Sequence, residues 1–186
     1  MKLDKLWNGL KQIANGDYVL EGDLVSEETI EIDLDDRLVV RGKIVSKKSI
    51  IVAKGLIADC GIKAGWGIKA GCGIKAGCGI KAGWGIEAGW GIKAGEGIKA
   101  GEGIKAGWGI KAKTYIHSEK RIFAGVSVYH TNDNCTKTIT CAELRKGEVC
   151  FGELVITKPE EPAETIMSIA EIETALGIKN LKIKEN

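Results

Sequence analysis

Histidine and cysteine are the residue types in this chain that could carry catalysis or bind a metal. His117 and His130 are the only two histidines, so acid–base catalysis by imidazole would have to use one of them. His130 is followed by Cys135, Cys141 and Cys150, but intervals of four, five and eight residues lack the close cysteine pairs of zinc sites. The chain also lacks a Ser-His-Asp spacing, a paired-carboxylate signature and a phosphate-binding loop. We therefore expect no metal site, no cofactor and no enzymatic activity.

Lysine and tryptophan recur at regular intervals and have the chemistry of binding instead. Lysine ammonium groups attract anions, and tryptophan offers a large aromatic surface to a base or a protein side chain. The candidate binding residues are Lys63, Lys75, Lys81, Lys93, Lys99, Trp66, Trp84, Trp90 and Trp108.

These residues belong to a six-residue unit, Gly-Ile-Lys-Ala-Gly-X, that repeats nine times from Gly61 to Lys113. Ile, Lys and Ala alternate inward, outward and inward, as a short strand requires. Gly-X-Gly then turns a corner, where we expect glycine to adopt positive φ. Because X includes both tryptophan and glutamate, it must point outward. Three units make a triangular coil of 18 residues, and each coil must stack on the next to bury its apolar residues.

The frame continues beyond the regular repeat. Aliphatic residues at six-residue steps extend it back to Ile32 and forward to Val128, which predicts 17 strands. The expected fold is mainly β, a single-stranded triangular parallel β-helix (a hexapeptide β-solenoid) whose handedness the sequence leaves open.

Both ends of the solenoid are expected to carry caps, since stacked coils otherwise expose unpaired strand edges. Apolar residues at three- and four-residue intervals over 2–14 predict an amphipathic helix. We expect this capping helix within 1–16, the solenoid over 17–130 with its regular repeats at 61–114, short strands over 131–157, and a linker with a C-terminal helix and tail over 158–186. The C-terminal cap is thus a small β/α unit.

A period of 18 residues places the outward side chains in vertical columns. Lys63, Lys81 and Lys99 share one face, and Lys75 and Lys93 share another. Two interpretations stay open: the columns bind anions, or a duplicated repeat has copied lysine for solubility and edge protection. The first coils place aliphatic residues at the same outward positions, and we expect these to meet a second copy of the chain, a partner or the C-terminal segment. They are Val39, Val45, Ile51 and Ile57.

Charge is segregated along the chain although the net charge is only +2. Residues 17–36 carry nine acids and no base, whereas residues 61–114 carry nine lysines and three glutamates. No apolar run resembles a signal peptide or a membrane span, so we expect a cytoplasmic protein that does not contact a membrane. Reduced thiols are expected there, despite six cysteines.

The six-residue period with an inward aliphatic residue resembles the hexapeptide-repeat proteins, which form triangular parallel β-helices. Many members of that family are acyltransferase trimers that bind acyl-coenzyme A and use a histidine as general base. Here the small residue Ala64 follows Ile62 by two positions, whereas in those enzymes it precedes the aliphatic residue, and their protruding histidine loop is missing. The repeat also resembles, more weakly, the bactofilin-type polymer-forming proteins.

The function that the sequence predicts is a non-enzymatic binding module, which presents lysine columns and tryptophan corners to a macromolecular partner. A protein is favoured over nucleic acid as that partner, and self-association is possible. An inhibitor or adaptor encoded by a phage or another mobile element fits this description. The alternatives are a self-assembling, bactofilin-like scaffold and a hexapeptide acyltransferase trimer. The sequence does not name the partner, the host or the oligomeric state.

Overall fold

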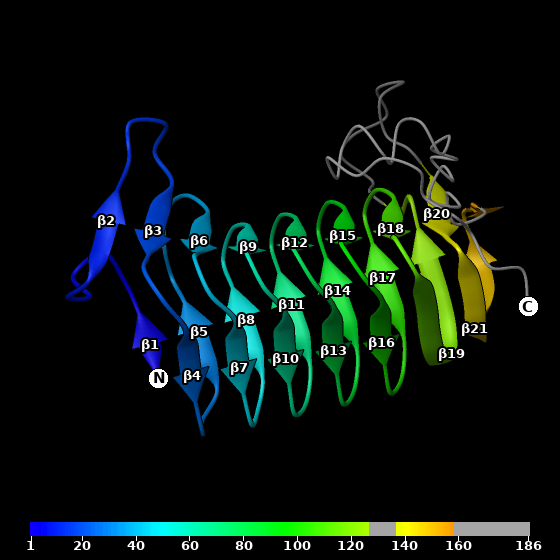
Figure 1. The fold of residues 1–186 in the computed structure, drawn as a ribbon, viewed down its shortest axis with the longest axis horizontal. Coiled ribbons are helices and arrows are strands. Elements are labelled where there is room, and N and C mark those ends of the chain that lie inside the picture. Colours follow the sequence, from blue (N-terminus) through cyan, green and yellow to red (C-terminus); the bar gives the residue numbers. More distant parts are fainter. Residues whose placement is uncertain (127–136, 158–186) are drawn as a thin grey trace, which may run out of the picture.

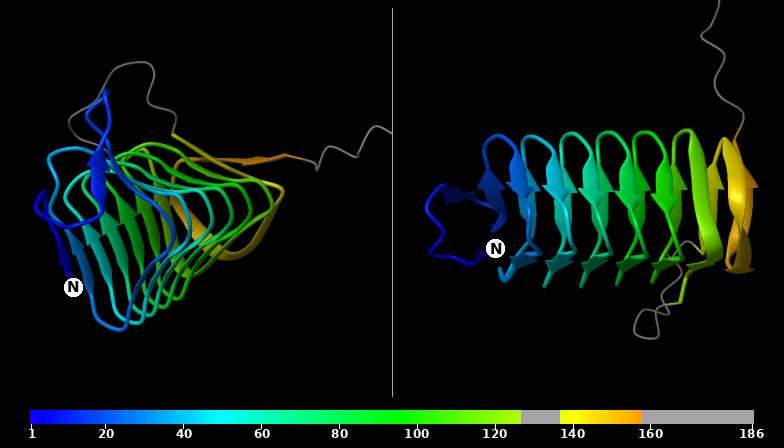
Figure 2. Two further views of the ribbon diagram at one scale, coloured as in Figure 1. Left: turned by 60° about the vertical axis from the view of Figure 1, so that its left-hand side comes forward. Right: turned by 90° about the horizontal axis from the view of Figure 1, so that it is seen from below.

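A computed structural model describes residues 1–126 and 137–157. In it the chain winds into a rod of stacked three-sided coils, with strands on all three faces (Figure 1; Figure 2). The first face consists of β4 (Leu24–Ser26), β7 (Ile44–Ser46), β10 (Ile62–Ala64), β13 (Ile80–Ala82), β16 (Ile98–Ala100) and the start of β19 (Tyr115–Ala124). The second consists of β1 (Lys2–Leu3), β5 (Ile30–Ile32), β8 (Ile50–Val52), β11 (Ile68–Ala70), β14 (Ile86–Ala88), β17 (Ile104–Ala106) and the end of β19.

A separate nine-stranded sheet makes the third face. It consists of β2 (Leu10–Gln12), β3 (Tyr18–Leu20), β6 (Leu38–Val40), β9 (Leu56–Ala58), β12 (Ile74–Ala76), β15 (Ile92–Ala94), β18 (Ile110–Ala112), β20 (Thr138–Cys141) and β22 (Glu153–Ile156). The last coil is completed by β21 (Glu143–Phe151), which pairs with β19. The expected parallel β-solenoid is therefore confirmed.

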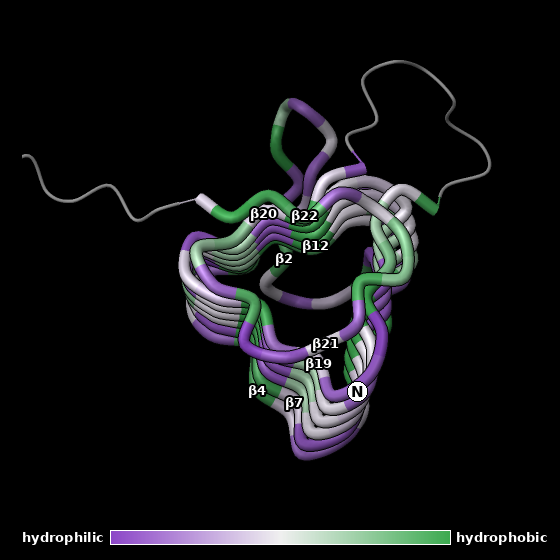
Figure 3. Tube along the Cα trace, turned by 90° about the vertical axis from the view of Figure 1, so that its right-hand side faces the viewer, coloured by the Kyte–Doolittle hydropathy of each residue, from purple (hydrophilic) through white to green (hydrophobic). Residues whose placement is uncertain are grey.

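The core is a set of apolar columns that run along the rod axis. In β10–β18 the isoleucine and the alanine of every strand are buried, while the residue between them faces outward. Parallel pairing keeps this order from coil to coil, so that Ile80 lies on Ile62 and Ala82 lies on Ala64. Viewed along the axis, the coils superpose into a triangular outline (Figure 3). Burial of these side chains is the main favourable term that holds one coil on the next.

The corner glycines differ from the expectation that they adopt positive φ. Within 61–113, all of which the structure describes, no glycine has a positive φ. Glycine is required here because the backbones of adjacent coils approach closely. A Cβ added to Gly83, after the alanine, would lie 1.9 Å from the carbonyl oxygen of Gly65 in the preceding coil. A Cβ added to Gly85, after the tryptophan, would lie 3.4 Å from the carbonyl oxygen of Gly103. Only the first of these two positions forbids a side chain.

The first coil is longer than the others, which corrects the predicted frame. Tyr18 pairs with Leu38 and Ile30 pairs with Ile50, offsets of twenty residues, before the offset of eighteen begins at Leu38. Two additional residues lie in the corner between β5 and β6, where Leu34 is buried. Ile32 therefore occupies the second inward position of β5, and the regular strands begin two strands before β5, at β3.

The predicted helix over 2–14 is wrong. Leu3 lies in β1, the edge strand of the second face, and is fully buried, whereas Leu6 is 92% exposed. The apolar residues of this segment therefore do not share one face. The segment instead supplies β1 to the edge of β5 and forms an antiparallel hairpin in which β2 pairs with β3. An isolated helix of this length is marginal in water, and it would leave the edges of the first coil without hydrogen-bond partners.

Strands β20, β21 and β22 pair in parallel with the preceding coil, so residues 138–156 extend the rod (Figure 1). The helix predicted within 158–186 lies outside the described residues.

The two corner glycines that flank Trp84 provide a matched test of coil packing. We expect Gly83→Ala to lower the free energy of unfolding by about 1–3 kcal/mol, because its methyl group must displace a carbonyl group of the coil beneath. Gly85→Ala should stay within about 1 kcal/mol of the wild type. Thermal unfolding followed by circular dichroism measures both, and equal destabilisation by the two substitutions would contradict the packing described.

Candidate functional site

The outward side chains form one column on each face, in the register that the sequence predicts. On the first face the column is Val25, Val45, Lys63, Lys81, Lys99 and His117. On the second it is Glu31, Ile51, Lys69, Glu87, Lys105 and Phe123. On the third it is Val19, Val39, Ile57, Lys75, Lys93, Lys111 and Thr140. The structure thus brings the candidate lysines together as two separate groups on different faces.

The three lysine columns differ in how their charge is compensated. On the second face the carboxylate of Glu87 lies between Lys69 and Lys105, at 3.9 and 3.5 Å from their ammonium groups. Within the part of the chain that the structure describes, no carboxylate lies within 4.0 Å of the repeat lysines of the first and third faces. Neighbouring lysines there face each other across one strand spacing, at a cost on the order of 1 kcal/mol per pair in water.

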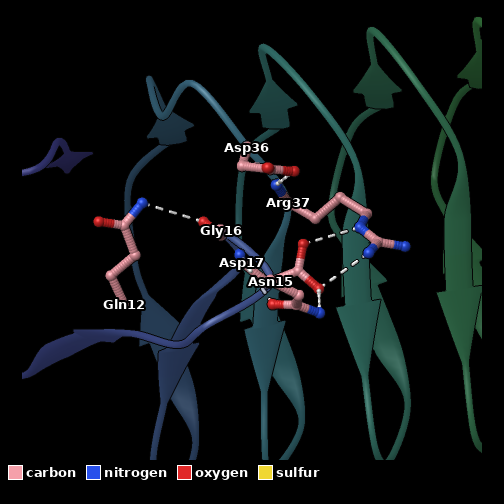
Figure 4. A network of polar contacts seen from close by, with 6 residues as sticks. All are labelled: Gln12, Asn15, Gly16, Asp17, Asp36 and Arg37. Atoms are coloured by element: carbon pink, nitrogen blue, oxygen red, sulfur yellow. Dashed lines mark hydrogen bonds and ion pairs between the residues drawn. The ribbon is translucent and has the colours of Figure 1, made fainter.

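Six of the nine acids in the N-terminal zone form ion pairs, four of them with the coil that follows. Asp17, almost fully buried, accepts hydrogen bonds of 2.8 and 2.9 Å from the guanidinium group of Arg37, which lies twenty residues later (Figure 4). This pairing raises the pKa of Arg37 further and ties the turn between β2 and β3 to the next coil. Within that turn the side-chain amide of Asn15 also donates to Asp17, at 3.0 Å. The same twenty-residue offset joins Asp23 to Lys43, Glu27 to Lys47 and Glu28 to Lys48, whereas Asp33 and Asp35 pair with Lys2 and Lys5.

The tryptophans form two outward ladders at the corners of the rod. Trp66 and Trp84 stack with ring centroids 5.4 Å apart and planes inclined by 7°; Trp90 and Trp108 stack at 5.2 Å and 4°. Trp84 is 56% exposed, so the expectation that the indoles lie outside the rod is confirmed. Each ring covers one face of its neighbour. Stacking on the bases of a nucleic acid needs free ring faces, and each of these indoles has at most one face left for a base.

A groove runs along each face beside its lysine column. The groove of the third face has a volume of about 510 Å³ and is lined by Trp90, Trp108, Lys75, Lys93 and Lys111. The groove of the second face, of about 960 Å³, contains Trp84, whereas that of the first face, of about 630 Å³, contains Tyr115 and, among the residues described, no tryptophan. The second and third grooves thus bring together lysines and tryptophans, which the sequence places in separate columns.

The four aliphatic residues of the first coils lie in the predicted outward register but are not equally accessible. Ile51 is 44% exposed, Val45 and Ile57 are half-buried, and Val39 is buried with 8% of its surface exposed. The most exposed aliphatic side chain of these columns, Val25 at 54%, was missed by the sequence analysis. Val25 lies twenty residues before Val45, whereas a strict period of eighteen places the outward position at residue 27.

His117 ends the lysine column of the first face in a small charged cluster. Its Nε2 lies 2.7 Å from the carboxylate of Glu119, and the ammonium group of Lys146 in β21 also contacts that carboxylate. The hydrogen bond from Lys146, followed by that from His117, lowers the pKa of Glu119 to about 2. The imidazole is thus engaged by a carboxylate at the surface of the last coils.

The cysteines do not gather around a metal-binding position in the described part of the chain. Cys60, Cys72, Cys78 and Cys150 are free thiols, and burial raises the pKa of the Cys141 thiol. Over residues 1–126 and 137–157 there is no group of three or more His, Cys, Asp or Glu residues arranged to hold a metal ion. The remaining members of the proposed set, His130 and Cys135, lie outside the described residues.

Comparison of the chain with protein-family models, with curated proteins and with solved structures finds no match. In the ranges that the structure describes, no helix is long and apolar enough to cross a membrane. The function of the protein must therefore be inferred from the chemistry of its three faces and their corners.

The depressed pKa of Glu119 predicts a specific pH dependence. A carboxyl group whose pKa falls from 4.5 to about 2 on folding stabilises the protein above pH 4.5, and this contribution is lost as pH falls through about 2. A ¹³C NMR titration should give a midpoint near 2 for the Glu119 carboxyl, moved upward by Lys146→Gln. As a control, Arg145→Gln removes a neighbouring cation that pairs with Glu143 and should leave the midpoint unchanged. A wild-type midpoint near 4.5 would contradict this pairing.

Proposed function

We propose that this protein is a rigid binding module whose first and third faces hold an acidic protein partner. The observation that supports this most strongly is the uneven compensation of charge. The same chain pairs Asp17 with Arg37 and places Glu87 between two lysines, yet it leaves the lysine columns of two faces without carboxylates among the described residues. The residues proposed for contact are Lys63, Lys75, Lys81, Lys93, Lys99, Trp66, Trp84, Trp90 and Trp108.

The rod holds these lysines in place before a partner arrives. The backbone on either side of each outward residue is fixed by hydrogen bonds to the adjacent coil, such as that from Ile80 N–H to the Gly97 carbonyl oxygen at 3.0 Å. Repulsion between lysines one strand spacing apart is relieved when anions lie between them. Preorganisation and relief of repulsion both favour the bound state.

Protein is favoured over nucleic acid as the partner because of the tryptophan ladders. In proteins that bind single strands without sequence preference, bases stack on free aromatic faces. Here Trp66 with Trp84, and Trp90 with Trp108, cover one face of each other, so each indole has at most one face left for a base, while aromatic residues are enriched in contacts between proteins. A non-enzymatic binding module is suited to act as an adaptor or an inhibitor. Its origin in a phage or another mobile element stays a prediction.

Capture of the partner from a lysate of the source cell tests this proposal. We expect the wild type to retain a protein that is lost, by at least tenfold, when Lys75, Lys81, Lys93 and Lys99 are all changed to Gln. Lys69→Glu with Lys105→Glu on the second face changes the net charge by the same amount and should retain it. Quantitative mass spectrometry at two salt concentrations measures the captured proteins.

Equal capture by all three proteins would refute the assignment of the two faces. Captured material that disappears on nuclease treatment would refute a protein partner.

End-to-end assembly into a filament is a second candidate function, and one observation favours it. Among the described residues, β4 is the last strand at one end of the first face, and β21 and β22 are the last strands at the opposite end of the rod. Open edges of parallel strands accept further strands.

Electron microscopy of the purified protein at micromolar concentration separates the two candidates. The binding-module proposal predicts single rods. Long filaments would instead support the scaffold.

A further inference from the structure

The groove on the third face differs from the other two in the charge of its lining. Among the described residues, its titratable cations are Arg37, Lys75, Lys93 and Lys111, and no aspartate or glutamate lines it. The carboxylate of Glu96 lines the groove of the first face, and four glutamates line that of the second. The grooves of the first and second faces are built from the same repeat and contain lysines as well as carboxylates. The repeat alone therefore does not explain why the charged residues of the third groove are all cations.

One wall of this groove is apolar and the other is cationic. Trp90 and Trp108 form the corner wall, stacked on each other, and Ile57 lies at the N-terminal end of the lysine column. The guanidinium group of Arg37 is already held by Asp17, so its charge is compensated. The charge available to a ligand therefore comes from three lysines, and at the C-terminal end Thr140 continues their column.

The backbone of this face offers no anion-binding cradle. The N–H groups of Ile74 and Ile92 donate to the carbonyl oxygens of Gly91 and Gly109 in the next coil, at 3.0 and 3.1 Å. A phosphate site usually draws on free backbone N–H groups or on guanidinium groups that bind two oxygens at once. Isolated ammonium groups beside an indole wall fit carboxylates that are accompanied by apolar side chains.

We propose that the groove of the third face is the docking site for an acidic polypeptide segment that lies along the rod axis. This inference deepens the proposed function and rests on it, by naming the chemistry of the segment that the third face contacts. Carboxylates of the segment lie against Lys75, Lys93 and Lys111, and its apolar side chains contact the edges of Trp90 and Trp108.

The dimensions of the groove set the length of the segment. From Ile57 to Thr140 the column crosses four strand spacings, about 19 Å at ~4.8 Å each. An extended chain advances about 3.3 Å per residue, so about six residues span it. Alternate side chains of such a chain point to the same side, about 6.6 Å apart, a spacing that flexible lysine side chains can follow.

Fluorescence anisotropy with a labelled octaglutamate peptide tests the site on the intact chain. We expect the triple variant Lys75→Gln, Lys93→Gln, Lys111→Gln to bind the peptide at least tenfold more weakly than the wild type. The matched control changes Lys69, Lys105 and Lys120 to Gln in the groove of the second face. It removes the same charge outside the proposed contact residues and should bind within about twofold of the wild type.

A labelled oligothymidylate of eight nucleotides serves as the second probe, and we expect it to bind more weakly than the peptide. Equal losses for both triple variants, or a loss confined to the second-face variant, would overturn the assignment to the third face. Oligothymidylate binding as tight as peptide binding would overturn the acidic polypeptide. Absence of peptide binding to the wild type at 50 mM salt would also overturn the inference, whereas the proposed function is judged separately by the partner captured from cells.

Discussion

The hydrogen bonds between successive coils are the constraint on which the rest of this structure depends. They bring each residue of the repeat next to the residue eighteen positions later, as Trp84 N–H donates to the Trp66 carbonyl oxygen at 3.0 Å. Since the sequence has the same period, each inward side chain of the repeat meets a copy of itself, and two pairs of tryptophans meet at the corners. Isoleucine packs on isoleucine inside the rod and tryptophan stacks on tryptophan at the corners, and both contacts are favourable.

The same constraint is unfavourable wherever the repeated residue is charged. The chain answers it differently along its length. In the first coils acids and bases alternate from one coil to the next, as Asp17 and Arg37 do, and on the second face Glu87 interrupts the lysines. Among the described residues, no carboxylate compensates the lysine columns of the first and third faces in this way. We therefore locate function on these faces, where the arrangement that costs stability has been kept.

Two expectations failed for the same physical reason, which is that contacts between coils outweigh local preference. The spacing of Leu3, Leu6 and Leu10 satisfies a helix, but Leu3 gains more by entering the core, and the first coil needs strands at its edges. Glycine at Gly83 was explained by positive φ, a local property, whereas the carbonyl group of Gly65 in the coil beneath it imposes the requirement. Leu3 pairs with Ile32 and Gly83 lies against Gly65, so both deciding contacts join residues that are distant in sequence.

The sequence by itself determined the period, the solenoid and the division into inward and outward residues, because hydrophobic alternation and an eighteen-residue coil are local patterns that stacking merely repeats. It also placed the candidate lysines and tryptophans in their columns. Only the tertiary structure decided the twenty-residue first coil, the ion pairs that neutralise the acidic zone, and the grooves that set Lys93 beside Trp90. These depend on which residues meet across a corner and between coils, and two additional residues in one corner change the offset of the first coil from eighteen to twenty.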